Sequence, residues 1–90
     1  MNELKTKDIE IENFKFKIKE VSFLDEIDLV SGNFTSKESF MKTLNLCVVE
    51  PKMSDEFLKT LPGRVGNKLF DEIKKLNGWD KGDFLKTQRN

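Results

Sequence analysis

The sequence has no histidine, a single cysteine and no net charge at pH 7, and each absence excludes a class of protein. Without histidine, the chain lacks the usual general base and the commonest metal ligand. The single Cys47 forms no internal disulfide and leaves no cysteine pair for zinc or an iron–sulfur cluster. We therefore expect no catalytic triad, no zinc site and no cofactor, so the chain is not predicted to be an enzyme.

Two more features are missing: an excess of one charge and a long apolar run. Sixteen Lys and Arg residues balance sixteen Asp and Glu residues, which leaves no net positive charge to hold nucleic acid or an anionic membrane. The start of the chain has no signal-peptide core, and no stretch of 18 apolar residues follows. The reduced cysteine and these absences predict a cytoplasmic location.

The length allows one domain with a modest core. The chain has 90 residues, of which 37% are hydrophobic, so one compact unit is expected over residues 1–90. A core of this size gives small net stability, so self-association or partner binding is compatible with it. Residues 1–8 are polar and are expected to be flexible. Residues 79–90 lack a clear period and are expected to be either a docked tail or a flexible one.

The N-terminal region alternates apolar and charged residues with period two and predicts β-structure over residues 9–18. The alternation changes phase at Asn13, so either a tight turn separates two strands or a bulge bends one strand; we favour one bulged strand. A second apolar run, Cys47 to Val49, is rich in β-branched residues and ends before Pro51. That run is expected to pair with the first strand.

Capping residues predict the helices. Ser22 and Gly32 bracket a helix over residues 23–31, and Thr35 with Glu38 starts a second helix over residues 36–46. Ser54 starts a short helix that Pro62 ends, and a final amphipathic helix runs to the Asn77-Gly78 pair. The predicted fold class is α+β: a small, mostly helical single domain with a minor N-terminal strand element.

Three groups of residues have a chemical interpretation and a simpler structural one. Asp25, Glu26 and Asp28 suit a hard cation, but on a helix Glu26 lies about 100° from the other two, which favours a solvated face. The Gly63 to Lys68 segment resembles a phosphate loop but has the wrong spacing, so close helix packing at its glycines is expected. Cys47 lies on an apolar stripe and is expected to be a buried structural thiol.

Aromatic residues near lysines allow a further hypothesis. Lys15, Lys17 and Lys19 with Phe14 and Phe16 are typical of a platform for single-stranded nucleic acid, although nearby glutamates favour a plain polar strand face. Aromatic residues also follow the last helix, where they either anchor a partner or dock on the domain's own core. The predicted partner-binding residues are Phe57, Leu61, Trp79, Phe84 and Leu85.

The order of several short segments is informative as a set. Phe14 to Ile18, Val49-Glu50-Pro51 followed by Met53 to Glu56, Leu61-Pro62, and Val65 to Gly78 follow one another along the chain. Together they resemble the tail assembly chaperones of long-tailed phages and prophages of Gram-positive bacteria. The resemblance covers roughly residues 14–78, and it lies in the order and spacing of the segments because each segment is generic.

The resemblance implies a non-enzymatic role in the host-cell cytoplasm during virion assembly. Members of that family keep the tape-measure protein in solution and help tail-tube subunits assemble around it, often with a longer frameshifted product. The expected partners are therefore a tape-measure protein and a tail-tube protein, with no nucleic acid and no membrane. The alternative hypothesis is a small nucleic-acid-associated regulatory protein that uses Lys15, Lys17 and Lys19 with Phe16.

Overall fold

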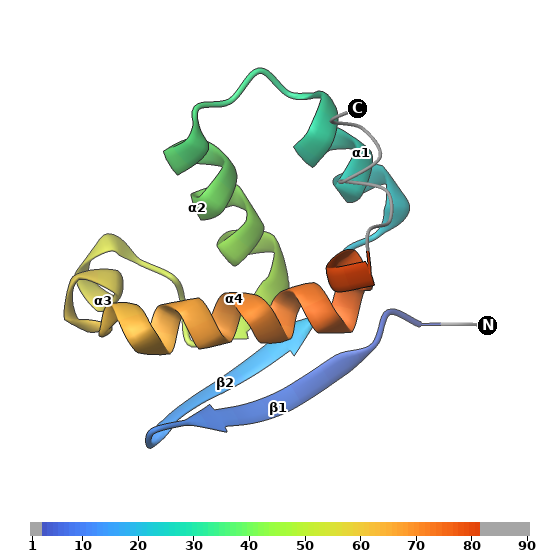
Figure 1. The fold of residues 1–90 in the computed structure, drawn as a ribbon. Coiled ribbons are helices and arrows are strands. Elements are labelled where there is room, and N and C mark those ends of the chain that lie inside the picture. Colours follow the sequence, from blue (N-terminus) through green and yellow to red (C-terminus); the bar gives the residue numbers. More distant parts are fainter. Residues whose placement is uncertain (1–2, 82–90) are drawn as a thin grey trace.

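The computed structural model describes residues 3–81, which form one sheet covered by helices on one face (Figure 1). The helix α4 lies along the sheet, and α1 and α2 stand on the far side of α4 from the β1–β2 hairpin (Figure 1). The α+β prediction is confirmed. The elements in chain order are β1 (Thr6–Ile11), β2 (Phe14–Lys19), α1 (Phe23–Ser31), α2 (Ser36–Cys47), β3 (Val48–Glu50), α3 (Asp55–Thr60), α4 (Gly63–Asn77) and a short 3-10 helix, η1 (Trp79–Lys81).

The sheet is antiparallel, and its strand order is β1-β2-β3. Ile9 of β1 lies opposite Phe16 of β2. At the other edge of β2, Ile18 lies opposite Val48 of β3. The 47–49 run therefore pairs with the N-terminal strand region, as predicted. The alternating side chains divide the sheet into an inner face toward α4, with Phe16 and Ile18 buried, and an outer face that bears the lysines of β2.

The favoured single bulged strand is wrong, and the tight turn is right. Glu12 and Asn13 have φ angles of 49° and 77°. Two central residues with positive φ match the twist of a two-residue hairpin, and asparagine tolerates that conformation well. The change of phase in the sequence arises because these two residues form the turn and belong to neither strand.

The first strand also begins earlier than predicted, at Thr6 rather than Ile9, inside the segment expected to be flexible. Two hydrogen bonds anchor it just before that point. The Glu20 amide donates to the Lys5 carbonyl at 2.9 Å, and the Lys5 amide donates to Glu20 Oε1 at 2.8 Å. The β2 ladder therefore supplies partners that the polar composition of this segment does not reveal.

The helices begin at the predicted caps. The Asp25 amide donates to Ser22 Oγ at 3.1 Å, and the Phe57 amide donates to Ser54 Oγ at 3.2 Å. Thr35 and Glu38 form a reciprocal capping box, and the helix they start, α2, extends one residue beyond its predicted end. These contacts are local, which is why the sequence predicts them well.

The longest helix, α4, follows Pro62 and ends at Gly78, whose φ of 77° gives the left-handed cap. Asn77 fixes this end of α4 to the start of α1, because its Oδ1 accepts a hydrogen bond from the Val21 amide at 2.9 Å. Trp79 follows directly and is buried, with Nε1 donating to Glu26 Oε1 at 3.0 Å. The buried hydrophobic core consists of Phe16, Ile18, Val21, Cys47, Val48, Met53, Val65, Leu69, Ile73 and Trp79.

Candidate protein-binding groove

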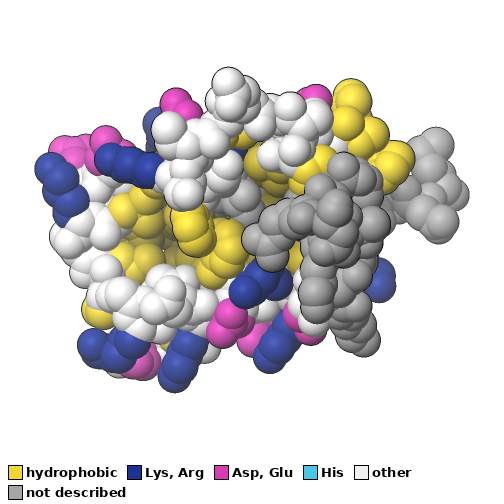
Figure 2. All heavy atoms as spheres, turned by 45° about the horizontal axis from the view of Figure 1, so that its top comes forward, with side chains coloured by type: hydrophobic (Ala, Val, Ile, Leu, Met, Phe, Trp, Pro, Cys, Tyr) yellow, Lys and Arg dark blue, Asp and Glu magenta, His cyan; other side chains and the backbone are white. Residues whose placement is uncertain are grey.

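An apolar groove of about 260 Å³ lies between α2, α3 and the first half of α4. Figure 2 shows hydrophobic side chains gathered in a hollow on one face of the molecule. Only one lining residue, an asparagine, has a polar side chain. The groove is lined by Phe40, Leu44, Leu58, Leu61, Pro62, Gly63, Gly66, Asn67, Leu69 and Phe70.

One end of this groove is formed by an aromatic pair. The rings of Phe40 on α2 and Phe70 on α4 have centroids 5.0 Å apart and planes tilted by 50°. The Lys74 ammonium lies 5.8 Å from the Phe70 ring centroid, within the range of a cation–π contact. Phe40 is nevertheless 54% exposed, so a large apolar surface is left uncovered at this end.

Two glycines of α4 lie along the groove, and neither packs against another element. A methyl group at Gly63 would meet no atom within 4 Å, and one at Gly66 would meet only Leu61 Cδ2, at 3.7 Å. The close helix packing predicted at these glycines is therefore wrong. Glycine inside a helix destabilises it by about 1 kcal/mol relative to alanine, and no contact within residues 3–81 requires glycine here.

The groove suits apolar side chains and offers no reactive group. Its volume of about 260 Å³ is below the range of roughly 300–1,000 Å³ typical of small-molecule pockets, and no titratable side chain lines it. Within residues 3–81, no group of three or more acidic or cysteine residues is arranged to hold a metal ion. Over the same range, no helix combines the length and apolar character needed to cross a bilayer.

The structure brings only part of the predicted partner-binding set to this groove. Leu61 lines it, whereas Phe57 does not and is half-buried against the core, with its ring edge-on to Phe16 and the centroids 6.5 Å apart. Trp79 is docked on the domain's own core, which is the second of the two placements expected for it. Phe84 and Leu85 lie outside the described residues.

Sequence reasoning missed the two aromatic residues of the groove because both belong to apolar stripes expected to be buried. The helical spacing groups Phe40 with Leu44 and Cys47, and it groups Phe70 with Leu69 and Ile73. Phe70 is one position beyond Leu69, which turns it about 100° away from the buried line of α4. That offset is visible in the sequence and marks Phe70 as a residue on the flank of the helix. Phe40 carries no comparable signal, because its exposure depends on how α2 crosses α4.

The acidic cluster divides as helical geometry predicts. Asp25 and Asp28 both line a hollow of about 340 Å³ between α1 and α2, which Lys42 also lines. Glu26 points elsewhere and accepts the Trp79 hydrogen bond. The three carboxylates therefore do not converge on one point. Asp28 is exposed, in agreement with the predicted solvated face.

Cys47 is fully buried between α2 and β3, which confirms the predicted structural thiol. Desolvation by this burial raises the pKa of the Cys47 thiol to about 12. At neutral pH the sulfur therefore stays protonated and unreactive.

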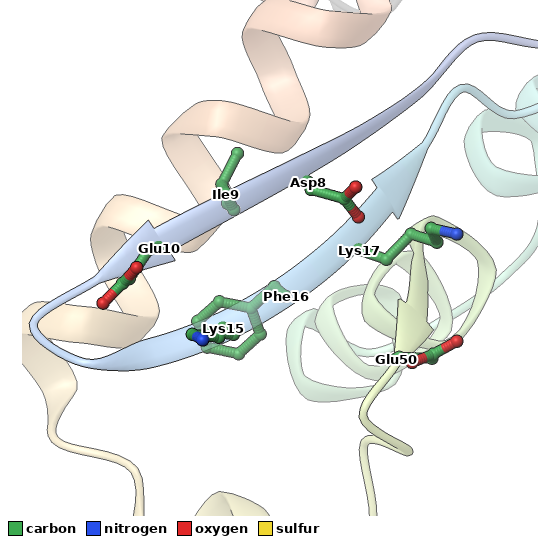
Figure 3. Close-up of a pocket in the computed structure, with 7 residues that line it drawn as sticks. All are labelled: Asp8, Ile9, Glu10, Lys15, Phe16, Lys17 and Glu50. Atoms are coloured by element: carbon green, nitrogen blue, oxygen red, sulfur yellow. The ribbon is translucent and has the colours of Figure 1, made fainter.

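The hypothesis of an aromatic–basic platform is wrong because the rings and the lysines lie on opposite faces of β2. Lys15, Lys17 and Lys19 do share the outer face of β2, but the alternation puts Phe14 and Phe16 on the inner face, where Phe16 is 3% exposed. Acids also lie among the lysines, with Glu10 opposite Lys15 and Asp8 opposite Lys17. Together with Glu50, they surround an open hollow of about 340 Å³ (Figure 3). The outer face is therefore a mixed charged surface without exposed rings.

Searches against protein-family models, curated proteins and solved structures find no match to this chain.

Proposed function

We propose that this protein binds an apolar, helical segment of another protein in the groove between α2, α3 and α4, and acts as a chaperone without catalysing a reaction. The observation that supports the proposal is the groove itself: an almost wholly apolar lining, a half-exposed phenylalanine and two glycines with open space above them. Amphipathic helices bind proteins by laying their apolar face into such grooves.

The glycines favour a helix as the occupant. Because Gly63 and Gly66 lie three residues apart on one side of α4, they leave a strip of bare backbone along the groove. A partner helix approaches a bare backbone more closely than it approaches one with side chains, and this increases its contact area. Phe40 and Phe70 then cover one end of the bound segment, in the way that aromatic anchors do in protein interfaces.

The finer proposal is that the partner is the tape-measure protein of a long-tailed phage. It is supported by the order of segments, in which this chain resembles tail assembly chaperones, and by the apolar character of the groove. Tape-measure proteins are long and helical in the family that the sequence resembles, and a groove for apolar helices suits such a client. Under this proposal the protein acts in the host-cell cytoplasm, where its one cysteine stays reduced.

Co-expression with the tape-measure protein from the same genome tests this function. We expect the wild-type chain to raise the soluble yield of the tape-measure protein, and Phe40→Asp and Gly66→Leu to lose most of that effect. Leu24→Asp is the matched control, because Leu24 is 67% exposed and does not line the groove. An unchanged yield with the wild-type chain contradicts the tape-measure proposal, and equal loss in Leu24→Asp contradicts the role of the groove.

A further inference from the structure

The strand β1 has an outer edge that no strand among residues 3–81 covers, because the sheet order is β1-β2-β3. The Lys5 carbonyl accepts a hydrogen bond from Glu20, so the backbone of Lys5 faces β2. Backbone groups alternate in direction along a strand, so those of Lys7, Ile9 and Ile11 also face β2. The amides and carbonyls of Thr6, Asp8 and Glu10 therefore point outward; we call this row the free edge.

The charges on the outer face alternate across the sheet toward this edge. Glu50 of β3 lies opposite Lys17 of β2, and Lys17 lies opposite Asp8 of β1. In the next row, Glu10 lies opposite Lys15. Within the described residues neither Asp8 nor Glu10 takes part in an ion pair. A further strand beyond β1 continues the alternation if it places basic side chains opposite these two acids.

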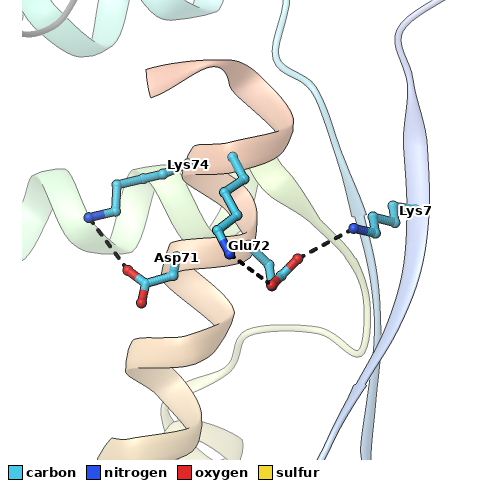
Figure 4. A network of polar contacts seen from close by, with 5 residues as sticks. Lys7, Asp71, Glu72 and Lys74 are labelled. Carbon is cyan, nitrogen blue, oxygen red and sulfur yellow. Dashed lines mark hydrogen bonds and ion pairs between the residues drawn. The ribbon is translucent and has the colours of Figure 1, made fainter. Parts of the chain in front are cut away.

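The inner face of β1 has a different requirement. Lys7 already has a partner there, because its Nζ lies 3.4 Å from Glu72 Oε1 on α4 (Figure 4). Ile9 and Ile11 are half-buried against the core and keep an exposed side. An added strand covers that side if it places apolar residues next to the two isoleucines.

A second copy of β1 does not meet these requirements. Directly opposed residues of an antiparallel pair lie on the same face of the sheet, so two β1 strands match their faces only in certain registers. Centring the pair on Asp8 puts Asp8 opposite itself, and centring it on Ile9 puts Asp8 opposite Glu10. Each of these registers opposes carboxylates, and centring the pair on Lys7 opposes two lysines, so the edge disfavours self-pairing and favours a different chain.

We propose that the free edge of β1 binds an extended segment of a partner protein in which basic and apolar residues alternate. The segment adds a fourth strand to the sheet, with backbone hydrogen bonds to Thr6, Asp8 and Glu10. Its basic side chains lie opposite Asp8 and Glu10, and its apolar side chains cover Ile9 and Ile11. This surface is separate from the groove, and α4 lies between the two (Figure 1).

A peptide titration followed by amide NMR tests the proposal with the full chain. The probe is a capped hexapeptide that alternates lysine and valine, and the control peptide has glutamate in place of lysine. We expect the lysine peptide to shift the amide signals of Thr6, Asp8 and Glu10 and slow their hydrogen exchange. The amides of Lys7, Ile9 and Ile11 already face β2 and are expected to change much less. Absence of binding, or shifts confined to residues outside β1, overturns the proposal.

Two variants separate backbone pairing from charge. Thr6→Pro removes an outward amide at the first position of β1, keeps both acids and leaves the bonds to β2 in place, so it is expected to keep the fold and to weaken lysine-peptide binding about tenfold. The double change Asp8→Lys with Glu10→Lys is expected to reverse the preference, so that the glutamate peptide binds better. Circular dichroism verifies the fold of each variant.

The control for site identity is Phe40→Asp, which alters the groove and is expected to leave peptide binding at the free edge unchanged. If the charge-reversed variant still prefers the lysine peptide, charge complementarity at this edge is wrong. If Phe40→Asp abolishes the amide shifts in β1, the peptide is bound at the groove and the edge proposal fails. Loss of chaperone activity in Phe40→Asp with intact peptide binding separates the groove function from this one.

Discussion

The two sides of α4 meet very different surroundings, although they belong to one helix. Toward the sheet, Val65, Leu69 and Ile73 are 0%, 1% and 0% exposed. Toward α2, the same helix presents Gly66 and Phe70 to an open groove. On the sheet side, the side chains of α4 are already buried by the rest of the chain. Each fully buried aliphatic side chain contributes roughly 1.5–3 kcal/mol to the free energy of folding. The groove side leaves apolar surface of the described residues uncovered, which is the pattern expected under the proposal that one face makes the fold and the other binds.

The largest effect is expected on the sheet side. Ile73→Ala leaves a cavity in the core away from the groove, and we expect the free energy of unfolding to fall by about 2–5 kcal/mol in urea titrations. Phe40→Ala on the groove side is expected to change it by less than about 1 kcal/mol, because Phe40 is half-exposed. Equal losses in the two variants would show that the core and the groove do not divide their roles in this way.

A smaller loss is expected where α4 ends against α1. Trp79→Phe removes the hydrogen bond to Glu26 and part of the buried ring, so stability should fall by about 1–3 kcal/mol. Thermal unfolding measures the change. Asp28→Asn is the control, because it lies on the same helix as Glu26 but is exposed, and it should stay within about 0.5 kcal/mol of wild type. Unchanged thermal unfolding in Trp79→Phe would contradict the docking of η1 on the core.

The groove side is expected to allow a gain in stability at the expense of binding. Gly66→Ala should raise the free energy of unfolding by about 0.5–1 kcal/mol, because alanine favours the helix and its methyl group meets only Leu61 at 3.7 Å. The same variant should raise the soluble yield of the client less than wild type does. A destabilised Gly66→Ala would show that this backbone is closely packed after all.

The smallest effect concerns pH at the hairpin turn. The hydrogen bonds from Arg64 Nε to both carboxylate oxygens of Glu12, each 3.0 Å, lower the pKa of Glu12 below its ordinary value of 4.5. Because the folded pKa lies below the unfolded one, the contribution of this pair is present above about pH 4.5 and is lost as the pH falls through the folded pKa.

A carboxyl NMR titration of Glu12 measures that shift directly. Arg64→Ala should return the midpoint of Glu12 toward 4.5, whereas Lys75→Ala, on the same helix, should leave it unchanged. A midpoint that does not respond to Arg64→Ala would contradict the assigned cause of the shift.

The accuracy of the sequence predictions follows the range of the interactions that decide each feature. Ser22, Thr35 and Ser54 bond to amides three residues away, so the starts of their helices follow from neighbouring residues alone. The hairpin turn was ambiguous because a phase change in the alternation fits a turn and a bulge equally well. The start of β1 was misplaced because the partners of Lys5 lie 15 residues away.

The groove depends on interactions of still longer range. Phe40 on α2 and Phe70 on α4 lie 30 positions apart in the sequence, and each belongs to a helix that also has a buried face. The sequence of either helix alone does not indicate that the two rings meet at the end of an open groove. The same holds for Gly63 and Gly66, whose surroundings depend on where α2 and α3 lie.

The sequence by itself determined the α+β class, the helix caps and the absence of histidine chemistry, because period, capping and composition are local properties. Within the described part of the chain, only the tertiary structure decided which apolar residues remain uncovered, which glycines face open space and which edge of the sheet is not paired with another strand. These features depend on how separate elements pack against one another, and packing is set by contacts between residues far apart in the chain.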